Sequence, residues 1–180
     1  MTAKTATIDF RTVDKELPIF STNISEYKQA LILAGQAIFE EKRENPESME
    51  SNVKAHYVSD YASHLRNEKF KPLIDIVLSF CEEISKTYYK CEAKFKCYNC
   101  WGMIYDENDY TEKHNHFPSA FGAVVYIELD EESSPIVFED QLTVVPSSGS
   151  LIVFPALLDH SVPKTKGRRL VVGMNIDNIL

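Results

Sequence analysis

Apolar residues recur every three or four positions in two stretches of the first half of the chain. The first stretch follows Ser25, a candidate N-cap, and ends before Pro46. The second runs from about Lys71 to Tyr89 and has a proline in its first turn. These patterns predict two amphipathic helices. The polar connection between them is expected to hold at most a short helical turn near residues 60–65.

After Cys91 the pattern changes to short apolar segments separated by turn residues, which is typical of β-strands. Seven such strands at near-regular spacing favour a barrel or sandwich. Several are apolar on both faces, so the two helices are expected to cover one sheet from outside. The predicted strands are Ala93–Tyr105, Phe121–Leu129, Ile136–Phe138, Leu142–Val145, Leu151–Phe154, Ser161–Val162 and Arg169–Ile176.

The chain length of 180 residues fits one domain. We expect residues 1–180 to form a single domain that is mainly β with N-terminal α-helices. Residues 1–90 are expected to give helical support and residues 91–180 the β core.

Composition and charge restrict the binding partners and the cellular location that we expect for this chain. A net charge of −8, from 19 basic and 27 acidic residues, disfavours nucleic acid and anionic membrane surfaces. The longest apolar runs fall short of the roughly 20 residues that span a bilayer. The first ten residues lack the apolar region of a signal peptide, so a cytoplasmic location is expected. Cys97 and Cys100 form a CxxC pair without a second pair, and we interpret them as structural residues rather than half of a zinc site.

Three histidines form the main candidate for metal chemistry. His114 and His116 stand one residue apart, before the apolar run at Phe121. On a strand, residues i and i+2 share a face, so both imidazoles can point at one metal ion. His160 follows a distant strand and is the candidate third ligand, because opposed sheets bring such positions together. Three ligands on one face leave positions open for substrate and oxygen.

The other two histidines, His56 and His64, lie in the helical half without a partner, and we interpret both as surface or structural residues.

Arg169 opens the last long strand and shares a face with Gly173 and Asn175, whereas Arg168 points to the opposite face. A guanidinium group grips a carboxylate through two parallel hydrogen bonds. A dicarboxylate that chelates the metal would present its far carboxylate at about this position. We therefore expect Arg169 to face inward and Gly173 to leave room for this cosubstrate.

The second half of the chain resembles the non-haem iron(II), 2-oxoglutarate-dependent oxygenases, especially a branch with HxH in place of HxD. Residues 67–77, NEKFKPLIDIV, also look like that branch. The residues that carry the resemblance are Trp101, Asp109–Tyr110, His114–Asn115–His116, Phe154–Pro155, His160–Pro163, Arg169 and Asn175.

This resemblance implies a double-stranded β-helix core of the jelly-roll or cupin-like type, with the helices packed on the larger sheet. It also implies Fe(II) at the open end and 2-oxoglutarate bound by the metal and Arg169. Tyr126 matches a strand tyrosine of the prolyl hydroxylases, and Tyr105 is a looser match.

The sequence departs from the family at His116, where most members have a carboxylate. An all-histidine set leaves Fe(II) with its full positive charge. Nearby acidic residues are expected to accept hydrogen bonds from the imidazole N–H groups; they are Asp106, Glu107, Asp109 and Glu112. Two alternatives stay open: only two of the histidines bind the metal directly, with His116 outside the ligand set, or the chain has lost catalysis.

The expected activity is hydroxylation of an unactivated C–H bond with O2 and 2-oxoglutarate as cosubstrates. The substrate is expected to be a peptide, as in prolyl hydroxylases, or a small molecule. A nucleic acid substrate is not expected, because members that act on nucleobases have a second arginine where this chain has Asn175. The alternatives are a three-histidine cupin-type dioxygenase that does not use 2-oxoglutarate, and a non-catalytic jelly-roll binding or structural module.

Overall fold

The computed structural model describes residues 16–179. Its helices are α1 (Lys28–Glu44), α2 (Ser63–Arg66), a 3-10 turn at Glu68–Phe70, and α3 (Lys71–Thr87). Both predicted helices and the short turn between them are confirmed. The prediction of Ser25 as N-cap is wrong: Tyr27 occupies the N-cap position of α1 without a side-chain capping bond, while the Ser25 hydroxyl donates to the Ser148 carbonyl. Among the described residues, no helix is long and apolar enough to cross a membrane.

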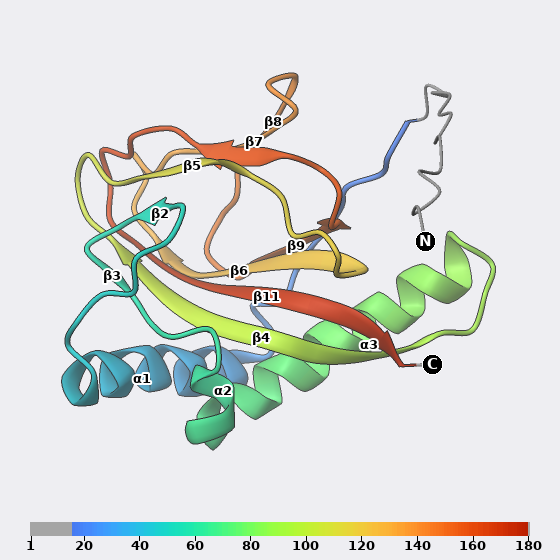
Figure 1. Cartoon of the computed structure of the whole chain (residues 1–180), viewed down its shortest axis with the longest axis horizontal. Coiled ribbons are helices and arrows are strands. Elements are labelled where there is room, and N and C mark those ends of the chain that lie inside the picture. Colours follow the sequence, from blue (N-terminus) through green and yellow to red (C-terminus); the bar gives the residue numbers. More distant parts are fainter. Residues whose placement is uncertain (1–15, 180) are drawn as a thin grey trace, which may run out of the picture.

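Two antiparallel sheets face each other (Figure 1). The six-stranded sheet has the order β1-β9-β6-β11-β4-β3, and the five-stranded sheet has the order β2-β5-β10-β7-β8. The seven predicted strands are present, with ends shifted by up to three residues. The strands are β1 (Phe20–Asn23), β2 (Val53–Lys54), β3 (Tyr57–Val58), β4 (Lys94–Tyr105), β5 (Tyr110–His114), β6 (Phe121–Leu129), β7 (Ile136–Phe138), β8 (Leu142–Val144), β9 (Ser150–Pro155), β10 (His160–Val162) and β11 (Arg169–Ile179).

The mainly β fold class with N-terminal helices is confirmed, but the first half is not purely helical. It also supplies β1 and β3 to the larger sheet and β2 to the smaller one. That residues 1–180 form a single domain stays a prediction, because residues 1–15 lie outside the described part of the chain.

The helices α1 and α3 cover the outer face of the larger sheet, as predicted (Figure 1). Their buried side chains, among them Ile38, Leu73 and Val77, form one apolar core with that face. Contact between helix and sheet is close at Gly102 of β4, where an added Cβ would lie 2.3 Å from Ile38 Cγ1. A second apolar core fills the space between the two sheets.

Strand β11 lies between these two cores and contributes to both, because successive side chains point to opposite faces of the sheet. Leu170, Val172 and Met174 face the helices. Arg169, Val171 and Gly173 point between the sheets and line a cavity there. The faces predicted for this strand are therefore confirmed, and they place Arg169 inside the fold.

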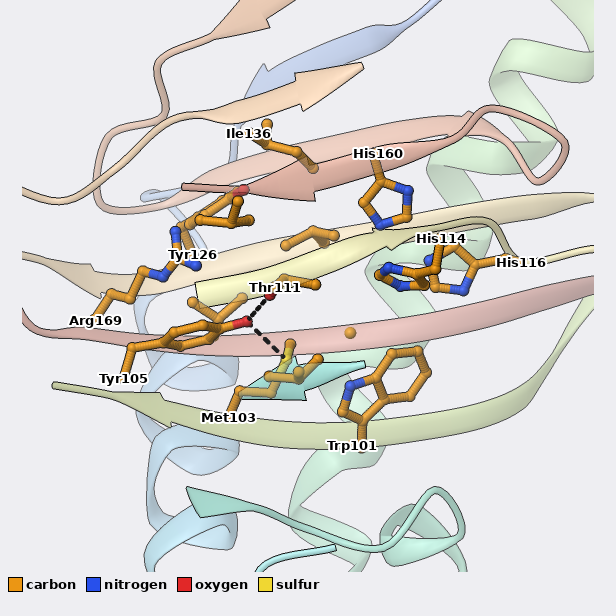
Figure 2. A pocket seen from close by; sticks show the side chains of 15 residues that line it. Trp101, Met103, Tyr105, Thr111, His114, His116, Tyr126, Ile136, His160 and Arg169 are labelled. Atoms are coloured by element: carbon orange, nitrogen blue, oxygen red, sulfur yellow. Dashed lines mark hydrogen bonds between the residues drawn. The ribbon is translucent and has the colours of Figure 1, made fainter. Parts of the chain in front are cut away.

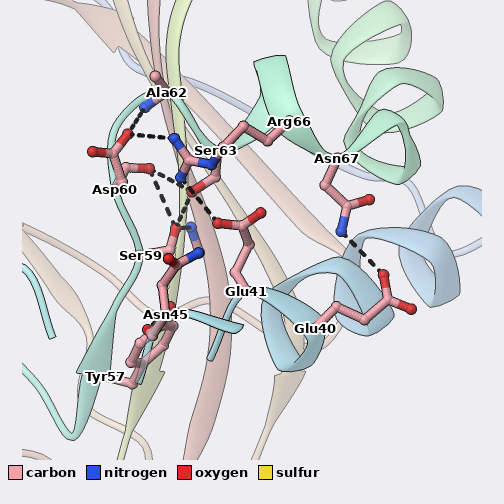
Figure 3. A network of polar contacts seen from close by, with 11 residues as sticks. Glu40, Glu41, Asn45, Tyr57, Ser59, Asp60, Ala62, Ser63, Arg66 and Asn67 are labelled. Atoms are coloured by element: carbon pink, nitrogen blue, oxygen red, sulfur yellow. Dashed lines mark hydrogen bonds and ion pairs between the residues drawn. The ribbon is translucent and has the colours of Figure 1, made fainter. Parts of the chain in front are cut away.

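The connection between α1 and α3 is held by a polar network rather than by apolar packing alone (Figure 3). Glu41 of α1 is buried, and its carboxylate accepts a hydrogen bond of 3.0 Å from Arg66 of α2. Arg66 also contacts the Asp60 carboxylate at 3.4 Å. The Ser59 hydroxyl accepts a hydrogen bond from the Gly102 amide of β4, so the network joins the helices to the larger sheet.

Candidate metal centre

Three imidazoles converge at one end of the space between the sheets (Figure 2). His114 ends β5 and is the register partner of His160, which begins β10. His116 lies in the loop after β5, where its amide donates to the Ala156 carbonyl. The ring centroids lie 4.3 Å apart for His114 and His160, 5.0 Å for His116 and His160, and 5.2 Å for His114 and His116.

One potential ligand nitrogen from each ring lies within 4.8 Å of the others, and within residues 16–179 this is the one cluster of at least three potential metal-binding side chains. The sequence placed His114 and His116 together on one strand, and that detail is wrong. The strand ends at His114, and the loop rather than strand alternation turns His116 toward the same point.

Each of the three rings has its Nδ1 atom facing a hydrogen-bond acceptor. These acceptors are the Glu112 carbonyl for His114 (2.8 Å), Asn175 Oδ1 for His116 (2.6 Å) and the Leu158 carbonyl for His160 (3.4 Å). Carbonyl oxygens only accept, so each Nδ1 carries the hydrogen and each Nε2 keeps its lone pair. This is the tautomer in which an imidazole ligates a metal through Nε2.

Burial also keeps the three imidazoles neutral. It is the main cause that lowers the pKa of all three imidazoles, and neighbouring rings lower those of His116 and His160 further. The pKa of His116 falls to about 4 and that of His160 to about 2. At neutral pH a metal ion would therefore displace no proton from these groups.

The acidic residues before the pair do not support the imidazoles in the way the sequence suggested. Asp106 accepts from Arg168 Nε at 2.7 Å, and Asp109 accepts from backbone amides, including that of His56. Glu107 is exposed. Glu112 supports His114 through its backbone carbonyl rather than its carboxylate. None of these four residues lines the cavity: three lie in the turn between β4 and β5, and Glu112 lies on β5.

Arg169 is a buried cation at the other end of the cavity. It is 3% exposed, and its guanidinium stacks on the Tyr105 ring with Cζ 3.9 Å from the centroid. Nη1 donates to the Ser134 carbonyl at 3.1 Å, while Nε has no hydrogen-bond partner among residues 16–179. Among residues 16–179, no acidic side chain lines the cavity. In contrast, Arg168 is exposed and pairs with Asp106. A buried guanidinium without a negatively charged neighbour is stabilised when an anionic ligand binds beside it.

Both tyrosines expected from the resemblance line the cavity (Figure 2), and Tyr105 lies at the Arg169 end as the register partner of that residue. Tyr126 is fully buried, and burial raises the pKa of its hydroxyl. The Tyr105 hydroxyl shares a hydrogen bond of 2.7 Å with Thr111. The cavity volume is about 40 Å³, which is room for one or two water molecules, so a larger ligand must displace wall side chains. Met103, which lines the cavity, has the flexible side chain suited to such a change.

Three residues in or beside the cavity wall have roles that the sequence did not reveal. The space beside Gly173, predicted to admit a cosubstrate, is filled by the Trp101 indole, and an added Cβ would lie 2.6 Å from that ring. Asn175 holds His116 instead of merely sharing the Arg169 face. The one signal available was that Gly173 and Asn175 follow Arg169 at even spacing.

The remaining candidates behave as structural residues. Cys97 and Cys100 lie on β4, where burial raises the pKa of the Cys100 thiol well above its usual value. His56 is exposed and His64 half-buried, and neither belongs to the metal-binding cluster.

No family model and no curated protein matches this sequence. Solved structures do share its fold. A prolyl-4-hydroxylase from Pseudomonas putida has a TM-score of 0.65 at 14% identity, over 90% of this chain and 93% of that one. A prolyl hydroxylase from Trichoplax adhaerens, in complex with a hypoxia inducible factor peptide fragment, gives 0.64 at 11% identity, over 88% and 83%.

The non-heme alpha ketoglutarate dependent carbocyclase SnoK, from nogalamycin biosynthesis, gives a TM-score of 0.66 at 10% identity, over 90% of this chain and 80% of that one. These likenesses cover nearly the whole chain. They show that its fold is the double-stranded β-helix, as the sequence predicted.

Proposed function

We propose that this chain is an Fe(II)- and 2-oxoglutarate-dependent oxygenase that hydroxylates an unactivated C–H bond. One observation carries the proposal: three convergent imidazole nitrogens and a buried, unbalanced guanidinium stand at opposite ends of one cavity. Within the double-stranded β-helix, this is the arrangement that a metal-chelating dicarboxylate needs.

The donor set fits Fe(II). His114, His116 and His160 would hold the ion through Nε2, because each Nδ1 is already engaged. Bound iron and 2-oxoglutarate would supply the oxygen activation, with O2 and 2-oxoglutarate consumed to give hydroxylated product, succinate and CO2.

Charge supports the same choice of cosubstrate. Three neutral imidazoles leave the iron with two positive charges, and Arg169 adds a third in a cavity without acidic lining. A dianion compensates most of this charge, with one carboxylate toward the metal and the other on the guanidinium. Tyr105 would keep the guanidinium in place through its stacked ring, and Tyr126 borders the path between the two ends.

For the substrate, we propose a peptide or a small molecule. The Trichoplax adhaerens structure with its peptide fragment supports the first class, and the carbocyclase SnoK supports the second. Nucleic acid is disfavoured by the net charge of −8. A cytoplasmic location stays a prediction from the sequence.

Anaerobic titration tests the cosubstrate. The Mn(II) form should bind 2-oxoglutarate, and Arg169→Met should weaken that binding by roughly 2–5 kcal/mol, the range for breaking a desolvated charge pair. Metal affinity should be unchanged. Arg168→Met is the matched control, because Arg168 is exposed on the opposite face and should not affect binding.

Two results would replace the proposal. Metal binding with equal 2-oxoglutarate affinity in wild type and Arg169→Met would favour the three-histidine dioxygenase. Failure of the chain to bind Fe(II), Mn(II) or Ni(II) would favour the non-catalytic module. Once binding is established, succinate release in the presence of O2 against a panel of peptides and small molecules identifies the substrate.

A further inference from the structure

Trp101 carries a buried hydrogen-bond donor without a partner. Its side chain is on β4, the residue is 5% exposed, and Nε1 has no acceptor among residues 16–179. An indole N–H can only donate. The ring lines the cavity beside the metal centre: its centroid lies 6.0 Å from that of His116. Figure 2 shows its nitrogen-bearing side turned toward the interior of the cavity.

The fold holds this indole in place from two sides. Gly173 of β11 is the register partner of Trp101, and the absence of a Cβ lets the ring lie against the strand. The Tyr61 ring packs edge-on against it, with a centroid distance of 4.9 Å. The N–H is therefore fixed in direction rather than free to find an acceptor elsewhere.

Trp101 and Arg169 mark the two ends of one cavity. Arg169 pairs with Tyr105, and Gly173 pairs with Trp101. The two pairs stand four residues apart along the strands, a separation of about 13 Å between backbones. Both side chains reach into the shared space, and each has an unpaired N–H. Trp101 is at the histidine end, and Arg169 is at the far end.

Neither of these N–H groups has a protein acceptor among residues 16–179. The hydroxyls of Tyr105 and Thr111 bond each other, and no carboxylate lines the cavity. We propose that Trp101 Nε1–H donates to the 2-oxo acid end of the cosubstrate, so that the cavity recognises a 2-oxo dicarboxylate at both ends. This inference rests on the proposed function and adds a positioning residue to it.

A crossed titration tests the role of Trp101. The anaerobic Mn(II) form is titrated with 2-oxoglutarate and with 2-oxopentanoate, which keeps the 2-oxo acid end but lacks the far carboxylate. Trp101→Phe should weaken both ligands by the same factor, about tenfold or more, equivalent to at least about 1.4 kcal/mol. Arg169→Met should weaken 2-oxoglutarate alone. Mn(II) affinity should stay the same in both variants.

Two further variants distinguish hydrogen-bond donation by Trp101 Nε1–H from the packing of the indole ring. Replacing Trp101 with benzothienylalanine puts sulfur in place of the N–H in a ring of the same shape, and it should reproduce the Trp101→Phe loss. Tyr61→Leu removes one of the two contacts that hold the ring but leaves the donor, so it should weaken both ligands less than Trp101→Phe does. Full affinity in the benzothienyl protein, or a loss in Tyr61→Leu as large as that in Trp101→Phe, would overturn the inference.

The outcomes also distinguish this inference from the proposed function. If Trp101→Phe binds both ligands like wild type while Arg169→Met loses 2-oxoglutarate, the inference fails and the proposed function stands. A loss confined to 2-oxoglutarate in Trp101→Phe also overturns the inference, because the donor would then act on the far carboxylate. If wild-type Mn(II) protein binds neither ligand, both proposals fail.

Discussion

At the scale of single residues, Asn175 connects the candidate metal centre to the larger sheet. Its Oδ1 accepts from His116 Nδ1 at 2.6 Å, and its Nδ2 donates to Asn99 Oδ1 at 3.0 Å. The amide is thus fixed at both ends. It orients a ring that stands in a loop and would otherwise have little to hold it. A neutral amide takes the place that acidic residues were expected to fill.

Asn175→Leu should therefore weaken Mn(II) or Fe(II) binding by about 10–100-fold, the usual effect of losing a partner that orients a ligand histidine. Competition with a metal-sensitive dye measures this change. Asn178→Leu is the matched control, because Asn178 is exposed on the same strand and should leave metal affinity unchanged. Equal affinities in the two variants would show that the loop alone orients His116.

At the scale of elements, the sequence predicted the parts with a long, regular period. Helices α1 and α3 and strand β11 repeat their pattern over many residues, so their faces could be assigned before the structure was known. Strands β2 and β3 have two residues each, too few to show alternation. Strand β5, YTEKH, is largely polar, and its place is set by pairing with β2 and β10 rather than by its own pattern.

In the candidate site too, some features could be predicted from the sequence and others could not. His114, His116, His160 and Arg169 could be found because their residue types are unusual in such positions. The contacts of Trp101 with Gly173 and of Asn175 with His116 could not, since they depend on which strands become neighbours and on the path of a loop.

The Glu41–Arg66 pair gives a prediction for the helical layer. Arg66→Met would leave a buried carboxylate without its charged partner and should lower the free energy of unfolding by roughly 1–3 kcal/mol. Arg43→Met is the control, because the Arg43–Glu44 pair is exposed and should contribute under about 1 kcal/mol. Urea unfolding measures both. Comparable losses would mean that the network of Figure 3 contributes nothing beyond surface charge.

At the scale of the whole molecule, the histidines stand where separate parts of the fold meet. His114 and His160 belong to neighbouring strands of the smaller sheet. His116 comes from the loop that follows and is held by β11 of the larger sheet. A metal ion bound by all three would join both sheets at one end. The unfolded chain has no such preformed site, so metal binding adds directly to the stability of the fold.

Metal loading should accordingly raise the melting temperature. At a free metal concentration of about 100 times Kd the gain is about 2.7 kcal/mol, which for a chain of this size corresponds to roughly 5–10 °C. Differential scanning calorimetry with Mn(II) or Ni(II) measures it. Mg(II), which prefers oxygen ligands, should give no shift. His160→Ala, compared with and without metal, should lose most of the shift because one of three ligands is gone. An undiminished shift in that variant would place the metal elsewhere and remove the basis for an iron centre between the sheets.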